Sequence, residues 1–89
     1  MRAKWVMHAL MHLDLEATRI AKQNPVAARA YVNRIFEGVA DLRAQPRLGR
    51  PGRVAGTREL PIPEIDRVIP YRLRNESIEI LRILPGSRS

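Results

Sequence analysis

The chain has 89 residues, which is the length of one small domain, and it contains no cysteine. Disulfide frameworks and thiolate metal sites are therefore excluded, and a 45% share of hydrophobic residues is enough for a packed core. Sixteen basic residues against nine acidic ones give a net charge of +7, which points to an acidic partner, either nucleic acid or an acidic protein. No apolar run approaches the roughly 20 residues of a membrane span, and no signal peptide is recognised, so we expect a single cytoplasmic domain over residues 1–89.

The first half of the chain predicts a short strand followed by two helices. Residues 2–7 carry a weak strand signal, and from His8 onward apolar residues recur at steps of three and four, which is the period of one helix face. Asn24 and Pro25 end this helix and begin a second one, which runs to about residue 44. Because the link is so short, we expect an antiparallel helical hairpin. The predicted core-facing residues are Leu10, Leu13, Ala17, Ile20 and Ala21 in the first helix and Ala28, Val32, Ile35, Phe36, Val39 and Leu42 in the second.

The second half of the chain predicts strands. A loop rich in Gly and Pro over residues 46–56 precedes a strand at 59–62, a second strand at 65–73 and a third at 77–84. Prolines at positions 61, 63 and 70 are expected at edges or bulges, since proline cannot donate a ladder hydrogen bond. The order strand, helix, helix, strand, strand, strand predicts an α+β domain, in which a helical hairpin packs on one face of a mainly antiparallel sheet.

The predicted third strand is apolar in both of its alternating sets of residues. Ile78, Ile80 and Leu84 form one set, and Leu81 and Ile83 form the other. A strand with this pattern is usually covered on both sides, whereas one helical hairpin can cover only one face of the sheet. We therefore expect exposed apolar surface that a partner covers.

A run of basic residues without a single acid marks the central loop. Its arginines, between residues 42 and 58, are Arg43, Arg47, Arg50, Arg53 and Arg58. We predict that Arg47, Arg50, Arg53 and Arg58 bind the target, because guanidinium groups suit forked contacts to phosphate or carboxylate. The alternative is a solvated loop whose arginines only aid solubility. Arg58 begins the following strand, so we also expect it to pair with a carboxylate and to matter for folding.

Three further arginines, Arg67, Arg72 and Arg82, lie in the predicted strands. Such residues can stabilise a scissile phosphate, although pairing with a neighbouring carboxylate is commoner. His8 and His12 have the i, i+4 spacing of a two-histidine metal site, but no third ligand is in view, so we predict neither a metal nor another cofactor. The aromatic residues are too scattered to stack on nucleic-acid bases and are expected in the core. They are Trp5, Tyr31, Phe36 and Tyr71.

Several segments, in order along nearly the whole chain, resemble the RelE/ParE superfamily of toxins. The most specific are Gly49–Val54 and Gly56–Leu60, with the letters GRPGRV and GTREL, and Val68–Arg72 and Ile78–Leu84 also match. The resemblance implies the α+β fold deduced above and the role of the toxin in a type II toxin–antitoxin pair. It also implies a cognate antitoxin, whose extended or helical tail wraps the toxin, and contact with operator DNA only through that antitoxin.

Two activities are implied by this resemblance. RelE-like members cleave mRNA on the ribosome with basic residues and often a C-terminal His or Tyr, whereas ParE-like members inhibit DNA gyrase and lack that set. Arg67 falls where RelE-like members carry a catalytic arginine, so a nuclease would use Arg67, Arg72 and Arg82. However, the tail Leu84–Ser89 has neither His nor Tyr, and the loop glutamate of some members falls at about Gly52.

Cleavage of RNA through the 2′-hydroxyl needs a general base and a general acid, and arginine serves poorly because it stays protonated. The sequence therefore predicts a ParE-like toxin that binds gyrase and has no catalytic residues. A ribosome-dependent mRNA endonuclease and a stand-alone basic nucleic-acid-binding module are the alternatives.

Overall fold

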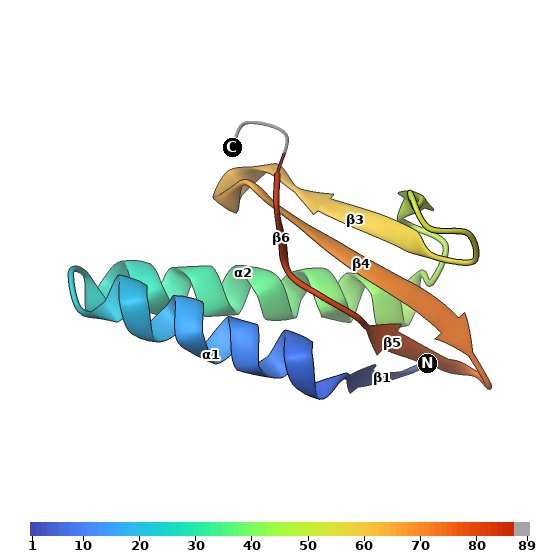
Figure 1. Ribbon diagram of the computed structural model, residues 1–89, viewed down its shortest axis with the longest axis horizontal. Helices are drawn as coiled ribbons and strands as arrows, with labels where there is room; N and C mark the ends of the chain where they lie inside the picture. Colours follow the sequence, from blue (N-terminus) through green and yellow to red (C-terminus); the bar gives the residue numbers. More distant parts are fainter. Residues whose placement is uncertain (87–89) are drawn as a thin grey trace.

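The computed structural model describes residues 1–86, which form two helices packed on one face of a mixed sheet (Figure 1). The sheet order is β1-β5-β4-β3-β2, and β6 pairs with β4 beyond the end of β5. The β1–β5 pair is parallel and the other pairs are antiparallel, so the predicted α+β architecture is confirmed. Neither helix in this part of the chain is long and apolar enough to cross a membrane. The elements are β1 (Arg2–Trp5), α1 (Met7–Ala21), α2 (Pro25–Ala44), β2 (Arg50–Pro51), β3 (Arg58–Ile62), the 3-10 turn η1 (Pro63–Ile65), β4 (Arg67–Arg74), β5 (Ser77–Ile80) and β6 (Leu84–Pro85).

The helical hairpin forms where the sequence predicted it. The side chain of Asn24 caps α2 by accepting the N–H of Ala27 at 3.0 Å, and Pro25 occupies the first turn, where a helix needs no N–H donor. Gly38 faces the sheet so closely that a Cβ there would lie 2.9 Å from Cδ1 of Ile62. This close approach gives a packing reason for a glycine inside α2.

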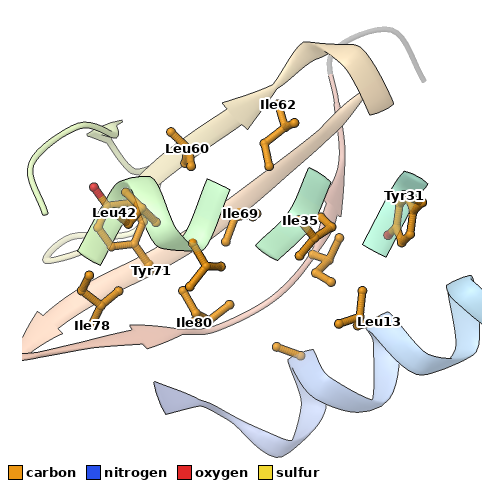
Figure 2. Packing of buried hydrophobic residues seen from close by; sticks show 13 residues of the cluster. Leu13, Tyr31, Ile35, Leu42, Leu60, Ile62, Ile69, Tyr71, Ile78 and Ile80 are labelled. Atoms are coloured by element: carbon orange, nitrogen blue, oxygen red, sulfur yellow. The ribbon is translucent and has the colours of Figure 1, made fainter. Parts of the chain in front are cut away.

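The core lies between α2 and the inner face of the sheet, with α1 closing one side (Figure 2). Figure 2 shows Ile35 and Leu42 of α2 facing the isoleucines and Tyr71 of the strands. Tyr31 and Tyr71 are buried as predicted, but Phe36 is 47% exposed. The ring of Phe36 contacts that of Trp5 edge-on, with ring centroids 5.7 Å apart. The fully or nearly fully buried members of the core include Ala9, Leu13, Ile35, Leu42, Ile62, Ile69, Ile78, Ile80 and Ile83.

The exposed face of α1 carries more apolar surface than the sequence predicted. Leu10, expected in the core, is 45% exposed, and the fully buried Ala9 takes the core-facing position instead. Met7, Met11 and Leu15 are all more than half exposed, at spacings of four residues along one side of the helix. The exposed apolar surface of the helical hairpin therefore lies mainly on α1.

The predicted third strand is broken into β5 and β6. Ile80 pairs with Tyr71 and Leu84 pairs with Val68, so three residues of the C-terminal segment face two residues of β4. Pro70 explains this bulge: its carbonyl accepts the N–H of Leu81 at 3.0 Å, but it has no N–H to donate in return. Pro70 therefore lies at a bulge, as its residue type predicted, although β4 is the central strand.

The bulge changes which side chains share a face. The one-residue offset places Ile83 in the core with Ile78 and Ile80, all with no exposed surface, and turns Leu84 to the other face with Val68. The predicted grouping of Leu84 with Ile78 and Ile80 was therefore wrong. Leu81 and Leu84 are half-buried. The outer face also carries a row of charged residues, Arg72, Glu79 and Lys4, across β4, β5 and β1.

The start of β4 also differs from the prediction. The strand was expected from residue 65, but it begins at Arg67 because Ile65 belongs to η1 and Asp66 has a left-handed backbone, with φ of 51°. Pro63 begins η1, and Pro61 lies on the part of β3 that β2 does not cover, which agrees with the expected positions of these prolines.

Candidate functional site: the basic loop

The loop between α2 and β3 is held to the sheet by Glu59, the first acidic residue after the basic run. Arg50 and Pro51 form β2, where a loop was predicted, and Arg50 lies directly opposite Glu59 in the ladder. The Arg50 guanidinium is 3.4 Å from one Glu59 oxygen, and Nε of Arg53 is 3.6 Å from the other. The backbone N–H of Arg53 also donates to Glu59 at 3.2 Å. One buried carboxylate therefore positions both arginines.

The two arginines remain available to a partner despite this pairing. Their side chains are 55% and 73% exposed, whereas the side chain of Glu59 is only 7% exposed. Because two guanidinium groups share one carboxylate, the cluster of Arg50, Arg53 and Glu59 has one net positive charge. Arg47, three residues before Arg50 in the same loop, adds a further exposed cation.

Arg58 is a structural residue and does not belong with the exposed arginines of this loop. Its terminal nitrogen donates to the carbonyls of Arg47, at 3.1 Å, and of Gly49, at 2.5 Å. The expectation that Arg58 matters for folding fits this geometry, but its expected carboxylate partner was wrong, because the partners are backbone oxygens. Its buried Nε has no hydrogen-bond partner among the described residues.

Tyr71 holds the other end of the loop from inside the core. Its hydroxyl donates to the carbonyl of Pro46 at 2.7 Å and accepts the N–H of Gly49 at 2.9 Å. A Cβ on Gly49 would lie 2.7 Å from both that hydroxyl oxygen and the carbonyl oxygen of Glu59, so only glycine fits there. Tyr71, Arg58 and Glu59 thus attach the loop to β3 and β4 along its length, which makes it a preorganised surface.

Arg67 lines a pocket together with Arg50 and Arg53, and it belongs to a partly buried network that joins both helices to β4. It donates to both oxygens of Glu16, at 3.1 and 2.9 Å, and to the backbone carbonyl of Asp66 at 2.9 Å. The Tyr31 hydroxyl donates to the same carboxylate, and Arg19 lies 3.5 Å from it. Burial raises the pKa of Glu16, but the hydrogen bonds from Arg67 and Tyr31 outweigh it, so this pKa lies below its ordinary value of 4.5. Burial and the Glu16 carboxylate raise the pKa of Tyr31.

The strand arginines do not converge on one site. Arg67 points toward the helices, whereas Arg72, five residues along the same strand, lies on the outer face and pairs with Glu79 at 2.5 Å. The hydrogen bond from Arg72 holds the pKa of Glu79 below its ordinary value. Arg82 is exposed in the bulge between β5 and β6. The commoner interpretation, pairing with carboxylates, thus holds for Arg67 and Arg72, but the carboxylate of Arg67 is Glu16, which the sequence did not indicate.

Comparison with known proteins identifies the family. A family model described as the ParE toxin of the type II toxin–antitoxin system parDE matches residues 4–89. The chain belongs to the ParE toxin family. A Sinorhizobium fredii protein named "Putative toxin Y4kP" is 41% identical over 83 residues, which cover 93% of this chain and 85% of that protein. A solved structure titled "Chromosomal ParDE TA system from P. aeruginosa" matches with a TM-score of 0.87 and 30% identity, over 98% of this chain and 97% of the other.

Family membership confirms the resemblance that the loop and strand motifs indicated, on its ParE-like side. In this ParE-family toxin, the arginines divide into an exposed rim, made of Arg47, Arg50 and Arg53, and a structural set that includes Arg58 and Arg67. His8 and His12 lie on α1, and no group of three or more His, Cys, Asp or Glu side chains within residues 1–86 is placed to hold a metal.

Proposed function

We propose that this ParE-family toxin arrests growth by binding DNA gyrase in the cytoplasm and that a cognate antitoxin neutralises it. The observation that carries the proposal is the ParE family match over residues 4–89. The likeness to a structure titled as a ParDE toxin–antitoxin system supports the antitoxin partner. Contact with operator DNA is proposed to occur only through that antitoxin.

The arrangement of the strand arginines supports binding over catalysis. A nuclease of the RelE type needs groups that take and give protons beside the scissile phosphate, and arginine stays protonated. Arg67 is bound by Glu16 on the inner side of β4, while Arg72 is bound by Glu79 on the outer side. The chain contains no His or Tyr after Tyr71, although Ser87–Ser89 lie outside the described residues. We therefore propose that this toxin has no catalytic residues.

The basic rim is the proposed contact to the target. Arg47, Arg50 and Arg53 are exposed on a loop that the sheet holds in place, so little conformational entropy is lost when a partner binds. Arg58 supports the loop through the carbonyls of Arg47 and Gly49, and it acts on the target indirectly. Such a surface fits acidic side chains of a protein partner.

The variant Arg47→Gln/Arg50→Gln tests the rim without leaving Glu59 unpaired, because Arg53 still contacts it. We expect the melting temperature to change by only a few degrees, since exposed charges usually alter stability by less than about 0.5 kcal/mol each. Inhibition of supercoiling by purified gyrase should weaken about tenfold and depend less on salt. The control Lys22→Gln/Arg29→Gln removes the same charge from the exposed hairpin. If both variants inhibited gyrase equally well, the basic rim would not be part of the target-binding site.

Induction in cells without the antitoxin tests the proposed target. Gyrase inhibition should produce DNA-damage signalling and filamentation, while protein synthesis continues at first. Rapid arrest of translation with cleaved mRNA would contradict the proposal in favour of the RelE-like alternative, and normal growth would exclude a toxin.

The antitoxin is proposed to be the product of the adjacent gene. The exposed Met7, Met11 and Leu15 of α1 support a protein partner, because contiguous apolar patches usually mark interaction sites. We expect the free antitoxin segment to be disordered and to fold on the toxin. Co-expressed toxin that elutes alone and binds no product of the adjacent gene would contradict this.

A further inference from the structure

A small pocket, which we call the outer pocket, lies beside the basic rim on the outer face of the sheet. Pro61 of β3 and Val68 of β4 are directly opposite each other in the ladder, so their side chains share this face. The pocket has a volume of about 190 Å³, and a cavity of roughly 150 Å³ already holds one benzene molecule, so it can hold one side chain but not a nucleotide. Its lining includes Arg50, Arg53, Pro61, Pro63, Asp66 and Val68.

Most of the hydrogen-bond donors of the two arginines are unused. Each guanidinium carries several N–H groups, but the side chain of Arg50 donates only one hydrogen bond within residues 1–86, to Glu59 at 3.4 Å. The guanidinium of Arg53 donates none there, and its Nε only approaches the same carboxylate, at 3.6 Å. Charge-assisted hydrogen bonds are about 2.7–2.9 Å long, so both arginines are loosely paired. Their donors are therefore available to a second acceptor.

The charge of this cluster favours one more carboxylate. Arg50, Arg53 and Glu59 have one net positive charge, and the side chain of Glu59 is only 7% exposed. The backbone N–H of Arg53 also holds Glu59, at 3.2 Å, so an incoming anion adds to Glu59 and does not replace it. One carboxylate from a partner would make the cluster neutral, through the forked contacts that guanidinium groups favour.

The rest of the lining distinguishes an acidic side chain from a phosphate group. Pro61, Pro63 and Val68 give the pocket an apolar part, on which the methylene groups of a glutamate can pack. Asp66 adds a negative charge, and its carboxylate lies so close to Gly86 that a Cβ there would overlap it. This carboxylate repels a second negative charge on a ligand. The pocket therefore suits a group with one charge and an apolar stem.

We propose that the outer pocket binds the side chain of one glutamate of the target protein, with its carboxylate at Arg50 and Arg53 and its methylene groups on Pro61 and Val68. This inference rests on the proposed function, which supplies a protein target, and it adds the residue type that the target uses and the place where it binds. Because the loop is attached to the sheet before the target arrives, little conformational freedom is lost on binding. A nucleic-acid phosphate at the same place would contradict the inference.

A carboxylate built into the outer pocket should compete with the one from the target. In Pro61→Glu, the new carboxylate belongs to the lining of the same pocket as the two arginines, whereas Pro61→Gln has the same size and the same backbone without the charge. We expect Pro61→Glu to inhibit supercoiling by purified gyrase at least about tenfold more weakly than Pro61→Gln. Its melting temperature should be no lower than that of Pro61→Gln, because the internal carboxylate pairs with the arginines. Equal inhibition by the two variants would overturn the inference.

The variant Gln23→Glu separates this competition from a general effect of charge. Gln23 is exposed in the link between the two helices, so the change adds the same negative charge outside the outer pocket. We expect Gln23→Glu to inhibit gyrase within about twofold of the natural chain. If Gln23→Glu weakens inhibition as much as Pro61→Glu does, net charge explains both effects and the pocket is not part of the target-binding site.

A peptide titration tests the pocket in the natural chain and without gyrase. The probe is a capped tripeptide with glutamate between two glycines, and the same peptide with glutamine is the control. At millimolar concentration, the glutamate peptide should shift the Nε–H NMR signals of Arg50 and Arg53, whereas the signal of Arg58, which does not line the pocket, should stay in place. If inorganic phosphate shifts these signals and the glutamate peptide does not, the pocket is a phosphate site and the inference is wrong.

The two proposals fail separately. If the natural chain inhibits gyrase, and Pro61→Glu and Pro61→Gln inhibit it equally, this inference is wrong while the proposed function stands. If the natural chain does not inhibit gyrase, the proposed function fails. In that case, shifts with the glutamate peptide alone would still support the carboxylate site, and their absence would exclude it.

Discussion

Replacing Arg67 with alanine is expected to destabilise the fold by about 3–5 kcal/mol, because it leaves a mostly buried carboxylate without its main partner. The side chains of Arg67 and Glu16 are only 21% and 12% exposed, and Arg67 donates to both carboxylate oxygens. The Tyr31 hydroxyl and the more exposed Arg19 are the partners that remain. Denaturant unfolding followed by circular dichroism measures the change in the free energy of unfolding.

The pH dependence of stability provides a second measurement of the same network. In the natural chain the pKa of Glu16 is held below its ordinary value of 4.5, so the folded state favours the ionised form. This carboxylate therefore contributes stability above pH 4.5 that is lost as the pH falls through the lower, folded-state pKa. In Arg67→Ala, burial without the guanidinium should raise the pKa of Glu16, so this contribution changes sign and the variant gains relative stability in acid.

Arg72→Ala is the matched control on the same strand. Its partner Glu79 is on the outer face, where water replaces a lost guanidinium, so we expect only a small change in stability. If Arg67→Ala and Arg72→Ala destabilise the fold equally, the network around Glu16 is not the connection between the helices and β4 described above.

The features that sequence analysis predicted correctly are local ones. The Asn24-Pro25 boundary, the second helix and the α+β order depend on neighbouring residues, and such signals can be read within a few positions. The faces of the residues after Ile80 could not be predicted in the same way. The bulge between β5 and β6, opposite Pro70, inverts the alternation, and it moved Ile83 into the core and Leu84 out of it.

The candidate site was predictable in its charge but not in its contacts. The acid-free run that contains Arg47, Arg50 and Arg53 was visible in the sequence. Its contact with Glu59 was not, because that contact depends on the pairing of Arg50 with Glu59 between β2 and β3, and β2 has only two residues. The pair of Arg67 and Glu16 joins residues 51 positions apart in the chain, so only the tertiary fold brings them together. The parity of the strand positions places Arg67 and Arg72 on opposite sides of β4, but it could not reveal which of them faces the helices.

The second large effect is expected when one oxygen atom is removed from the support of the basic loop. In Tyr71→Phe, the carbonyl of Pro46 loses its hydrogen-bond donor and the N–H of Gly49 loses its acceptor, at a residue with no exposed surface. Each buried polar group left without a partner costs about 1–3 kcal/mol, so we expect a loss of about 2–4 kcal/mol in total. For a domain of this size, that corresponds to a fall of roughly 10 °C or more in the melting temperature.

The same substitution should separate the support of the loop from the general stability of the fold. At a temperature where the variant is still folded, the amide of Gly49 should exchange faster, and inhibition of gyrase, the proposed target, should weaken, because the basic rim is no longer held in place. Tyr31→Phe is the control: it removes a hydroxyl that donates to Glu16 on the helix side, so it should lower stability but leave the Gly49 amide and the inhibition unchanged. Unchanged exchange at Gly49 in Tyr71→Phe would mean that Arg58 and Glu59 hold the loop without the tyrosine.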